Sequence, residues 1–226
     1  MRRIKKAVVW MGFMLAVCSS LHAQDGDESE KINSNLGFSI TAPLNPIAHY
    51  TSSRGGLTAG AGYNFNEHQS FISEFMWNSL SPTDAALQPI REALQDNTIN
   101  GHSDLYAMTG NYRYQLQGKA LGAYIIGGGG WYHRTFGLSK QVTTTTGITC
   151  TPVWRFYGFT CTSGTVTSNE TIVSSSSSVL GGNIGVGFTI KVSEPSYRVY
   201  FESRYHYAPT KNVNTQLIDV TIGIRY

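Results

Sequence analysis

Residues 216–226 read QLIDVTIGIRY, and apolar side chains alternate with polar or small ones along the stretch. The apolar face consists of Ile218, Val220, Ile222, Ile224 and Tyr226. The opposite face consists of Asp219, Thr221, Gly223 and Arg225. Strict alternation of this kind predicts a β-strand whose two faces meet different surroundings.

The same two-residue period recurs throughout the preceding sequence. The eight predicted strands cover residues 36–43, 56–66, 70–79, 105–116, 121–136, 179–192, 197–208 and 216–226. The facing of residues 121–136 stays open, because apolar side chains occupy both of its faces. The connections alternate between short turns and longer segments, and the longer ones are residues 44–55, 80–104, 137–178 and 209–215. An even number of such strands favours an all-β, antiparallel, up-and-down barrel.

Composition supports strands in a single domain. The chain has 226 residues, of which 41% are hydrophobic and 14% charged, so it is not a charge-rich disordered polymer. Its 24 glycines and 13 tyrosines suit strands and turns more than a helix bundle. Beyond the first 23 residues, no stretch supplies the roughly 20 consecutive apolar residues of a membrane helix. A membrane barrel remains open, since its strands need only about 9–11 alternating residues.

Residues 1–23 have the organisation of a secretory signal peptide. Four basic side chains precede an apolar run, and Leu21-His22-Ala23 is a plausible cleavage site. We therefore expect a periplasmic tail over residues 24–34 and a barrel domain over residues 35–226. Removing residues 1–23 leaves 13 basic and 14 acidic side chains, which excludes a basic nucleic-acid-binding protein.

The polar face decides between a membrane barrel and a soluble, lipocalin-like carrier. It carries charged groups, whereas the apolar face concentrates aromatic rings towards both strand ends, as the two interfaces of a bilayer favour. We therefore place the apolar face against lipid. A soluble carrier, the alternative, would keep its charged face in water.

An eight-stranded barrel has an interior that side chains fill. We expect the inward charges to form an internal ion-pair network, because unpaired charges in so narrow a lumen are costly. The network is predicted from Glu74, Arg113, Lys191, Arg198, Glu202, Arg204, Asp219 and Arg225. A small-solute channel is the alternative interpretation of the same lumen.

The chain resembles the eight-stranded outer-membrane β-barrels. The resemblance rests on the signal peptide, the series of β-hairpins, the stretch GAGYNFN at residues 60–66 and the last residues, IDVTIGIRY at 218–226. The resemblance is to the OmpA transmembrane domain and to OmpX. It implies a bacterial outer membrane, a periplasmic N-terminus and extracellular long loops. It also implies that the aromatic end, Tyr226, is the signal to the barrel-assembly machinery, and that outer-membrane lipid surrounds the barrel.

Cys150 and Cys161 lie in the longest connection, residues 137–178. Two closely spaced cysteines in an exported chain predict one disulfide. Between them lie Trp154, Arg155, Phe156 and Tyr157. Aromatic and Arg side chains dominate interface hot spots, so we predict contact with an extracellular partner. The alternative is that these side chains pack on one another and stabilise the loop.

The remaining motifs do not predict a catalytic or metal site. Residues 81–95 have helical periodicity, and Ser81 is the expected N-cap. Pro89 within the stretch argues against a helix. The histidines show no paired metal spacing, and we predict no metal site and no cofactor.

An enzyme is a further alternative. Some small outer-membrane barrels resemble lipid-modifying hydrolases with His and Ser two positions apart, but here His133 is followed by Thr135. We therefore expect a structural, non-enzymatic outer-membrane barrel with an adhesin-like contact role for its extracellular loops.

Overall fold

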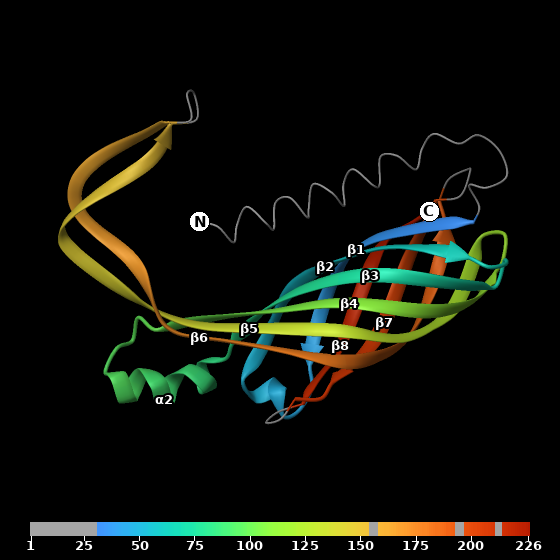
Figure 1. Ribbon diagram of the computed structural model, residues 1–226, viewed down its shortest axis with the longest axis horizontal. Coiled ribbons are helices and arrows are strands. Elements are labelled where there is room, and N and C mark those ends of the chain that lie inside the picture. The colour runs from blue at the N-terminus through green and yellow to red at the C-terminus, as the bar shows by residue number, and fades with distance from the viewer. Residues whose placement is uncertain (1–30, 154–157, 193–196, 211–213) are drawn as a thin grey trace.

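The computed structural model describes residues 31–153, 158–192, 197–210 and 214–226. Its strands form one closed antiparallel barrel in chain order (Figure 1). They are β1 (Ile32–Pro43), β2 (Thr51–Asn64), β3 (Gln69–Pro82), β4 (Asn100–Gln117), β5 (Leu121–Val153), β6 (Gly158–Lys191), β7 (Arg198–Ala208) and β8 (Thr215–Arg225). Phe38 of β1 faces Leu57 of β2 and Ile222 of β8, which closes the ring. The predicted eight-stranded up-and-down architecture is therefore confirmed.

The barrel has its apolar side chains outside and its polar ones inside. On β1, Leu36 is 60% and Phe38 69% exposed, whereas the alternate residues Asn35 and Ser39 are buried. Within the barrel, the other strands show a similar alternation of exposed and buried side chains. This arrangement is the reverse of a soluble protein, and it suits an apolar solvent around the barrel.

The structure fixes the facing of residues 121–136. Tyr124, Ile126 and Tyr132 are buried in the lumen, whereas Ile125 and Trp131 are exposed on the outside. Both faces read as apolar in the sequence because two tyrosines and an isoleucine contribute to the lumen here.

The prediction of a loop over residues 137–178 is wrong. These residues continue β5 and β6 as a paired ladder that extends to Val153 and Gly158, and the hairpin leaves the barrel and curves away from it (Figure 1). The alternation of apolar and polar side chains is missing here because neither face meets lipid. The many Thr residues nevertheless have high strand propensity.

Two short helices lie in the longer connections at the same end. A 3-10 helix, η1, covers Ile47–His49, and α2 covers Asp84–Leu94. Thr83, not Ser81, caps α2 by accepting from the Ala86 N–H at 3.3 Å. Ser81 stays in β3 because it precedes Pro82, and a residue before proline avoids helical geometry. Among the described residues, no helix has the length and apolar character to span a membrane.

β1 begins at Ile32, three residues before the predicted start of the barrel domain at residue 35. The predicted signal peptide, most of the predicted tail, and residues 154–157 lie outside the described residues.

Candidate functional site

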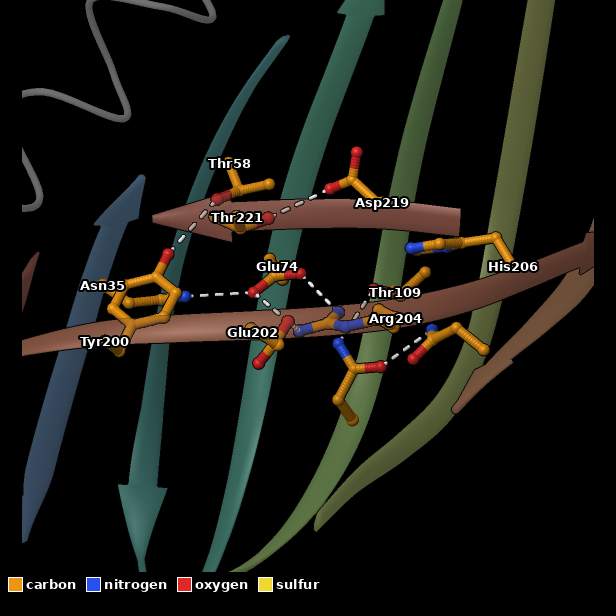
Figure 2. Close-up of polar contacts among 12 residues, drawn as sticks. Asn35, Thr58, Glu74, Thr109, Tyr200, Glu202, Arg204, His206, Asp219 and Thr221 are labelled. Carbon is orange, nitrogen blue, oxygen red and sulfur yellow. Dashed lines mark hydrogen bonds and ion pairs between the residues drawn. The ribbon is translucent and has the colours of Figure 1, made fainter. Parts of the chain in front are cut away.

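At the centre of the lumen, one arginine side chain lies between two carboxylates. Arg204 of β7 contacts Glu74 of β3 with Nη1 2.5 Å from Oε1, and it also forms an ion pair with Glu202, two residues away on its own strand (Figure 2). All three side chains are at most 6% exposed. The pairing crosses the barrel, because β3 and β7 are not neighbours in the ring.

Neutral hydrogen-bond donors complete this centre. Asn35 donates to Glu74 Oε2 at 3.0 Å, and the Tyr124 hydroxyl donates to Glu202 Oε2 at 2.9 Å. A Cβ on Gly187 would lie 2.3 Å from the Tyr124 ring, so glycine there makes room for the tyrosine. The buried carboxylates are thus compensated by both charge and hydrogen bonds, as burial requires.

Asp219 is held by hydroxyl and amide donors. Thr41 donates to its Oδ1 at 2.6 Å, Thr221 to its Oδ2 at 3.0 Å, and Asn78 to Oδ1 at 3.3 Å. Within the described part of the chain, Asp219 forms no ion pair. Asp219 stands directly opposite Arg204 in the β7–β8 ladder, yet these donors, and not an ion pair with Arg204, hold its carboxylate.

Two further arginines surround the aromatic rings towards the short-turn end. The Arg225 guanidinium lies 4.5 Å from the Tyr124 ring centroid and 5.1 Å from that of Tyr200, and Arg113 lies 5.9 Å from Tyr124. Neither arginine forms an ion pair within the described residues. Cation–π contacts, which strengthen when both groups are desolvated, replace the expected carboxylate partners.

The last two predicted network residues lie at the short-turn rim. Arg198 donates to the Gly118 carbonyl at 3.1 Å and stands opposite Lys191 in the β6–β7 ladder. The predicted network thus separates into an ion-paired centre, a hydroxyl-bound Asp219 and a basic short-turn half.

Sequence reasoning missed several neutral members of the lumen. Tyr132 lies with its hydroxyl 2.9 Å from His206 Nδ1, and Asn183 donates to Asn111 at 2.9 Å. These residues share the inward face with the charges, so their strand parity was the available signal.

An apolar layer closes the lumen above the polar centre, towards the long-loop end. It consists of Met76, Leu80, Leu105, Ala107, Tyr132, Ala208 and Leu217. A filled interior of this kind supports the barrel and does not provide a wide channel.

The outer rim carries a His–Ser contact. His133 Nδ1 lies 2.8 Å from the Ser178 hydroxyl on the neighbouring strand, and the His133 ring stacks on Trp131 with centroids 5.2 Å apart. Among the described residues, the ring has no carboxylate partner, which a catalytic histidine of this type uses for orientation. The contact partner is Ser178 and not Thr135.

Beyond the rim, β5 and β6 form a two-stranded ribbon, defined here as residues 140–153 and 158–170. The β4 ladder ends at Ser139 and the β7 ladder begins at Gly182, so within the described residues the ribbon strands pair only with each other. Lys140 and Glu170 form an exposed ion pair at 3.4 Å at its base. At about 3.3 Å per residue, the ribbon extends up to about 45 Å along its strands.

A disulfide closes the ribbon near its far end. Cys150 and Cys161 are directly opposite in the ladder, with their Cα atoms 4.0 Å apart. The predicted disulfide is therefore present. The four predicted contact residues between them, Trp154, Arg155, Phe156 and Tyr157, lie outside the described residues.

The described residues contain no group of three or more His, Cys, Asp or Glu side chains arranged to hold a metal ion.

Outside the barrel, Asp96 accepts from the Thr98 hydroxyl at 2.7 Å and from its N–H at 2.8 Å. These hydrogen bonds hold the pKa of the Asp96 carboxyl below its ordinary value.

Aromatic rings gather at the two ends of the apolar outer surface. At the short-turn end, Tyr197 and Tyr226 have ring centroids 5.2 Å apart. At the other end, Trp77 donates to Asp104 at 3.2 Å. Rings with polar tips prefer the two interfaces of a bilayer. The apolar outer surface between these rings, around a filled polar lumen, defines a transmembrane β-barrel.

Comparison with known proteins gives the family. The model of the outer membrane protein beta-barrel domain matches residues 11–226, and the chain belongs to this family. It is therefore a protein of the bacterial outer membrane whose outer surface contacts lipid. No curated protein matches the chain by sequence.

Solved structures share the fold at low sequence identity. A major outer membrane protein from Thermus thermophilus is similar with a TM-score of 0.52 and 8% identity, over 86% of this chain and 98% of that one. Ail, the attachment invasion locus protein of Yersinia pestis, has a TM-score of 0.45 and 13% identity, over 87% and 98%. Neisserial surface protein A has a TM-score of 0.45 and 12% identity, over 86% and 95%.

Proposed function

We propose that this protein is a non-enzymatic surface-contact protein whose barrel anchors the β5–β6 ribbon outside the cell. The observation that carries the proposal is the ribbon itself, which continues far beyond the barrel and is closed by a disulfide. A closed barrel needs no such extension for its own pairing. Surface-exposed segments carried by a rigid scaffold are where binding functions concentrate.

The proposal includes an orientation. The start of β1 and the end of β8 lie together at the short-turn end, where Ser34 and Tyr226 exchange backbone hydrogen bonds of 2.9 and 3.0 Å. Outer-membrane barrels keep short turns in the periplasm and longer loops outside. The N-terminus is then periplasmic, and the ribbon, η1 and α2 are extracellular.

The ribbon offers two kinds of contact. Its strands leave backbone groups on both outer edges, onto which an extended partner segment can add as a further strand. The sequence between its two strands is Trp154-Arg155-Phe156-Tyr157, and these residue types are enriched at binding hot spots. Edge pairing supplies affinity, and the side chains of residues 154–157 supply specificity.

The other candidate functions have less support. A small-solute channel conflicts with the ion-paired, aromatic and apolar side chains that fill the lumen. A soluble ligand carrier conflicts with the apolar outer surface. Lipid hydrolysis has the His133–Ser178 contact in its favour, without an orienting carboxylate on that histidine within the described residues.

The test is adhesion of bacteria that express variants of this protein to cultured host cells and to matrix-coated surfaces. We expect replacement of residues 141–169 by a short turn, and the pair Trp154→Ala and Tyr157→Ala, to reduce adhesion. The control is Leu94→Ala, which removes an exposed apolar side chain from α2. Adhesion that equals wild type in both ribbon variants, with surface levels unchanged, would refute the proposal.

We also propose that Tyr226 guides assembly by the barrel-assembly machinery. Its ring contacts Tyr197, so Tyr197→Ala breaks the same ring contact while keeping the terminal aromatic. We expect Tyr226→Ala to lower the amount of folded protein in the outer membrane and Tyr197→Ala to leave it near wild type. Equal losses in both variants would assign the effect to ring packing alone.

A further inference from the structure

The long-loop mouth of the barrel contains a cavity of about 430 Å³ that is partly open to solvent. Its walls come from η1, α2, the ends of β1, β3 and β8, and the base of the extended β5–β6 hairpin. The volume falls in the range of small-molecule sites, about 300–1,000 Å³.

The cavity walls are mainly apolar. Ile47 of η1 and Leu87 of α2 are buried against it, and Ile90 and Phe136 contribute further apolar surface. Leu217 lines the cavity and also belongs to the apolar layer that closes the lumen. The cavity is therefore a blind cup with an apolar floor.

Local contacts hold the helical side of this cup in place. The Thr83 hydroxyl donates to the His49 carbonyl at 2.7 Å, which joins the start of α2 to η1. Arg91 of α2 donates to the Ile99 carbonyl at 3.0 Å and pairs with Asp84 at 3.1 Å. The cup is thus formed by the fold before any ligand enters.

One charged side chain lines the cup within the described residues, and it is Arg134 of β5. Its Nη1 donates to the Thr215 hydroxyl of β8 at 3.3 Å, across the mouth from a strand that is not its neighbour in the ring. Among the described residues, Arg134 makes no ion pair and no other hydrogen bond. Its remaining N–H groups are available to an acceptor within the cup.

We propose that this cup binds a small amphipathic anion, a carboxylate that carries a single aliphatic chain. The chain lies against Ile47, Leu87 and Phe136, and the carboxylate accepts hydrogen bonds from Arg134. Apolar area removed from water drives entry of the chain. A guanidinium favours a carboxylate because its parallel N–H groups match the two oxygens.

The test uses the whole protein in phospholipid nanodiscs with dodecanoate that carries a photoactivatable diazirine, followed by mass-spectrometric mapping of the labelled peptides. Nanodiscs avoid a detergent that would compete for the cup. We expect label on the peptides that contain Ile47, Leu87 or Phe136, and we expect excess unlabelled dodecanoate to remove it. Label confined to the lipid-facing strand segments would overturn the proposal.

The charge is tested with Arg134→Gln, which removes the guanidinium and keeps a polar, hydrogen-bonding side chain. We expect half-maximal labelling to need at least about tenfold more dodecanoate, because a hydrogen bond to a charged group is lost. A diazirine-bearing dodecanol should label this variant and wild type equally. The matched control, Arg54→Gln, changes an exposed arginine outside the cup and should behave as wild type.

A second variant, Ala86→Phe, fills the cup from α2 without touching Arg134, and we expect it to block both probes. Heat-dependent gel mobility confirms in each case that the barrel is folded. Dodecanoate labelling of Arg134→Gln at the wild-type concentration, or unchanged labelling of Ala86→Phe, would overturn the proposal. These outcomes are independent of adhesion by the ribbon.

Discussion

Removing the Cys150–Cys161 disulfide should loosen the ribbon and leave the barrel intact. The two cysteines are 11 positions apart in the sequence, and closing a loop of this length contributes about 3 kcal/mol on the chain-entropy model. Isolated two-stranded hairpins are marginally stable in water, so this contribution is large for the ribbon. The ratio of open to closed ribbon should rise by roughly 150-fold when both cysteines become serine.

Hydrogen exchange of the Cys150→Ser, Cys161→Ser protein in nanodiscs measures this change. Peptides from residues 140–153 and 158–170 should exchange much faster than in wild type. Peptides from residues 121–136 and 179–191 of the same two strands should not change, because barrel neighbours pair with them. Ribbon exchange that stays the same after removal of the disulfide would refute the reasoning, since the ladder alone would then hold the ribbon.

Two further predictions concern the lumen and the rim. Arg204→Leu leaves two buried carboxylates without their cation and should cost about 3–5 kcal/mol in denaturant unfolding from lipid vesicles. Lys140→Ala, at an exposed ion pair, should cost less than about 1 kcal/mol, and equal losses would contradict the assigned role of burial. His133→Ala and Ser178→Ala should leave the masses of outer-membrane lipids as in cells with the wild-type protein. A mass change present with wild type and lost in both variants would show that the rim pair is catalytic.

The strands could be predicted from the sequence wherever one face of the strand contacts lipid and the other faces the lumen. Along β1 and β8 every second side chain meets either hydrocarbon or the lumen, and the sequence alternates accordingly. In residues 140–144 and 160–170 the side chains are exposed or only partly buried on both faces, so neither face needs apolar side chains. The same physical cause thus explains both the successful strand prediction and the missed ribbon.

Membership of the lumen was also readable, because strand parity determines which side chains face inward. The ion pairs themselves could not be predicted, since parity does not determine which inward side chains point at one another within the lumen. Arg204 pairs with Glu74 across the barrel, whereas the carboxylate of Asp219, the residue opposite Arg204 on β8, accepts from Thr41 and Thr221. Tyr124 was missed for a separate reason, namely that its strand has apolar side chains on both faces.

The apolar layer above the polar centre determines what the mouth of the barrel can do. An ion or polar solute that reached the cup would have to cross Leu80, Leu105 and Leu217 before reaching the ion-paired Arg204 centre of the lumen. Crossing such a layer removes water from a charge with no partner in place, which is strongly unfavourable. An aliphatic chain has the opposite preference, because the same layer is its best surface. The mouth is therefore built for retention of an amphipathic molecule and against conduction, and a planar-bilayer recording should show no discrete conductance with or without dodecanoate.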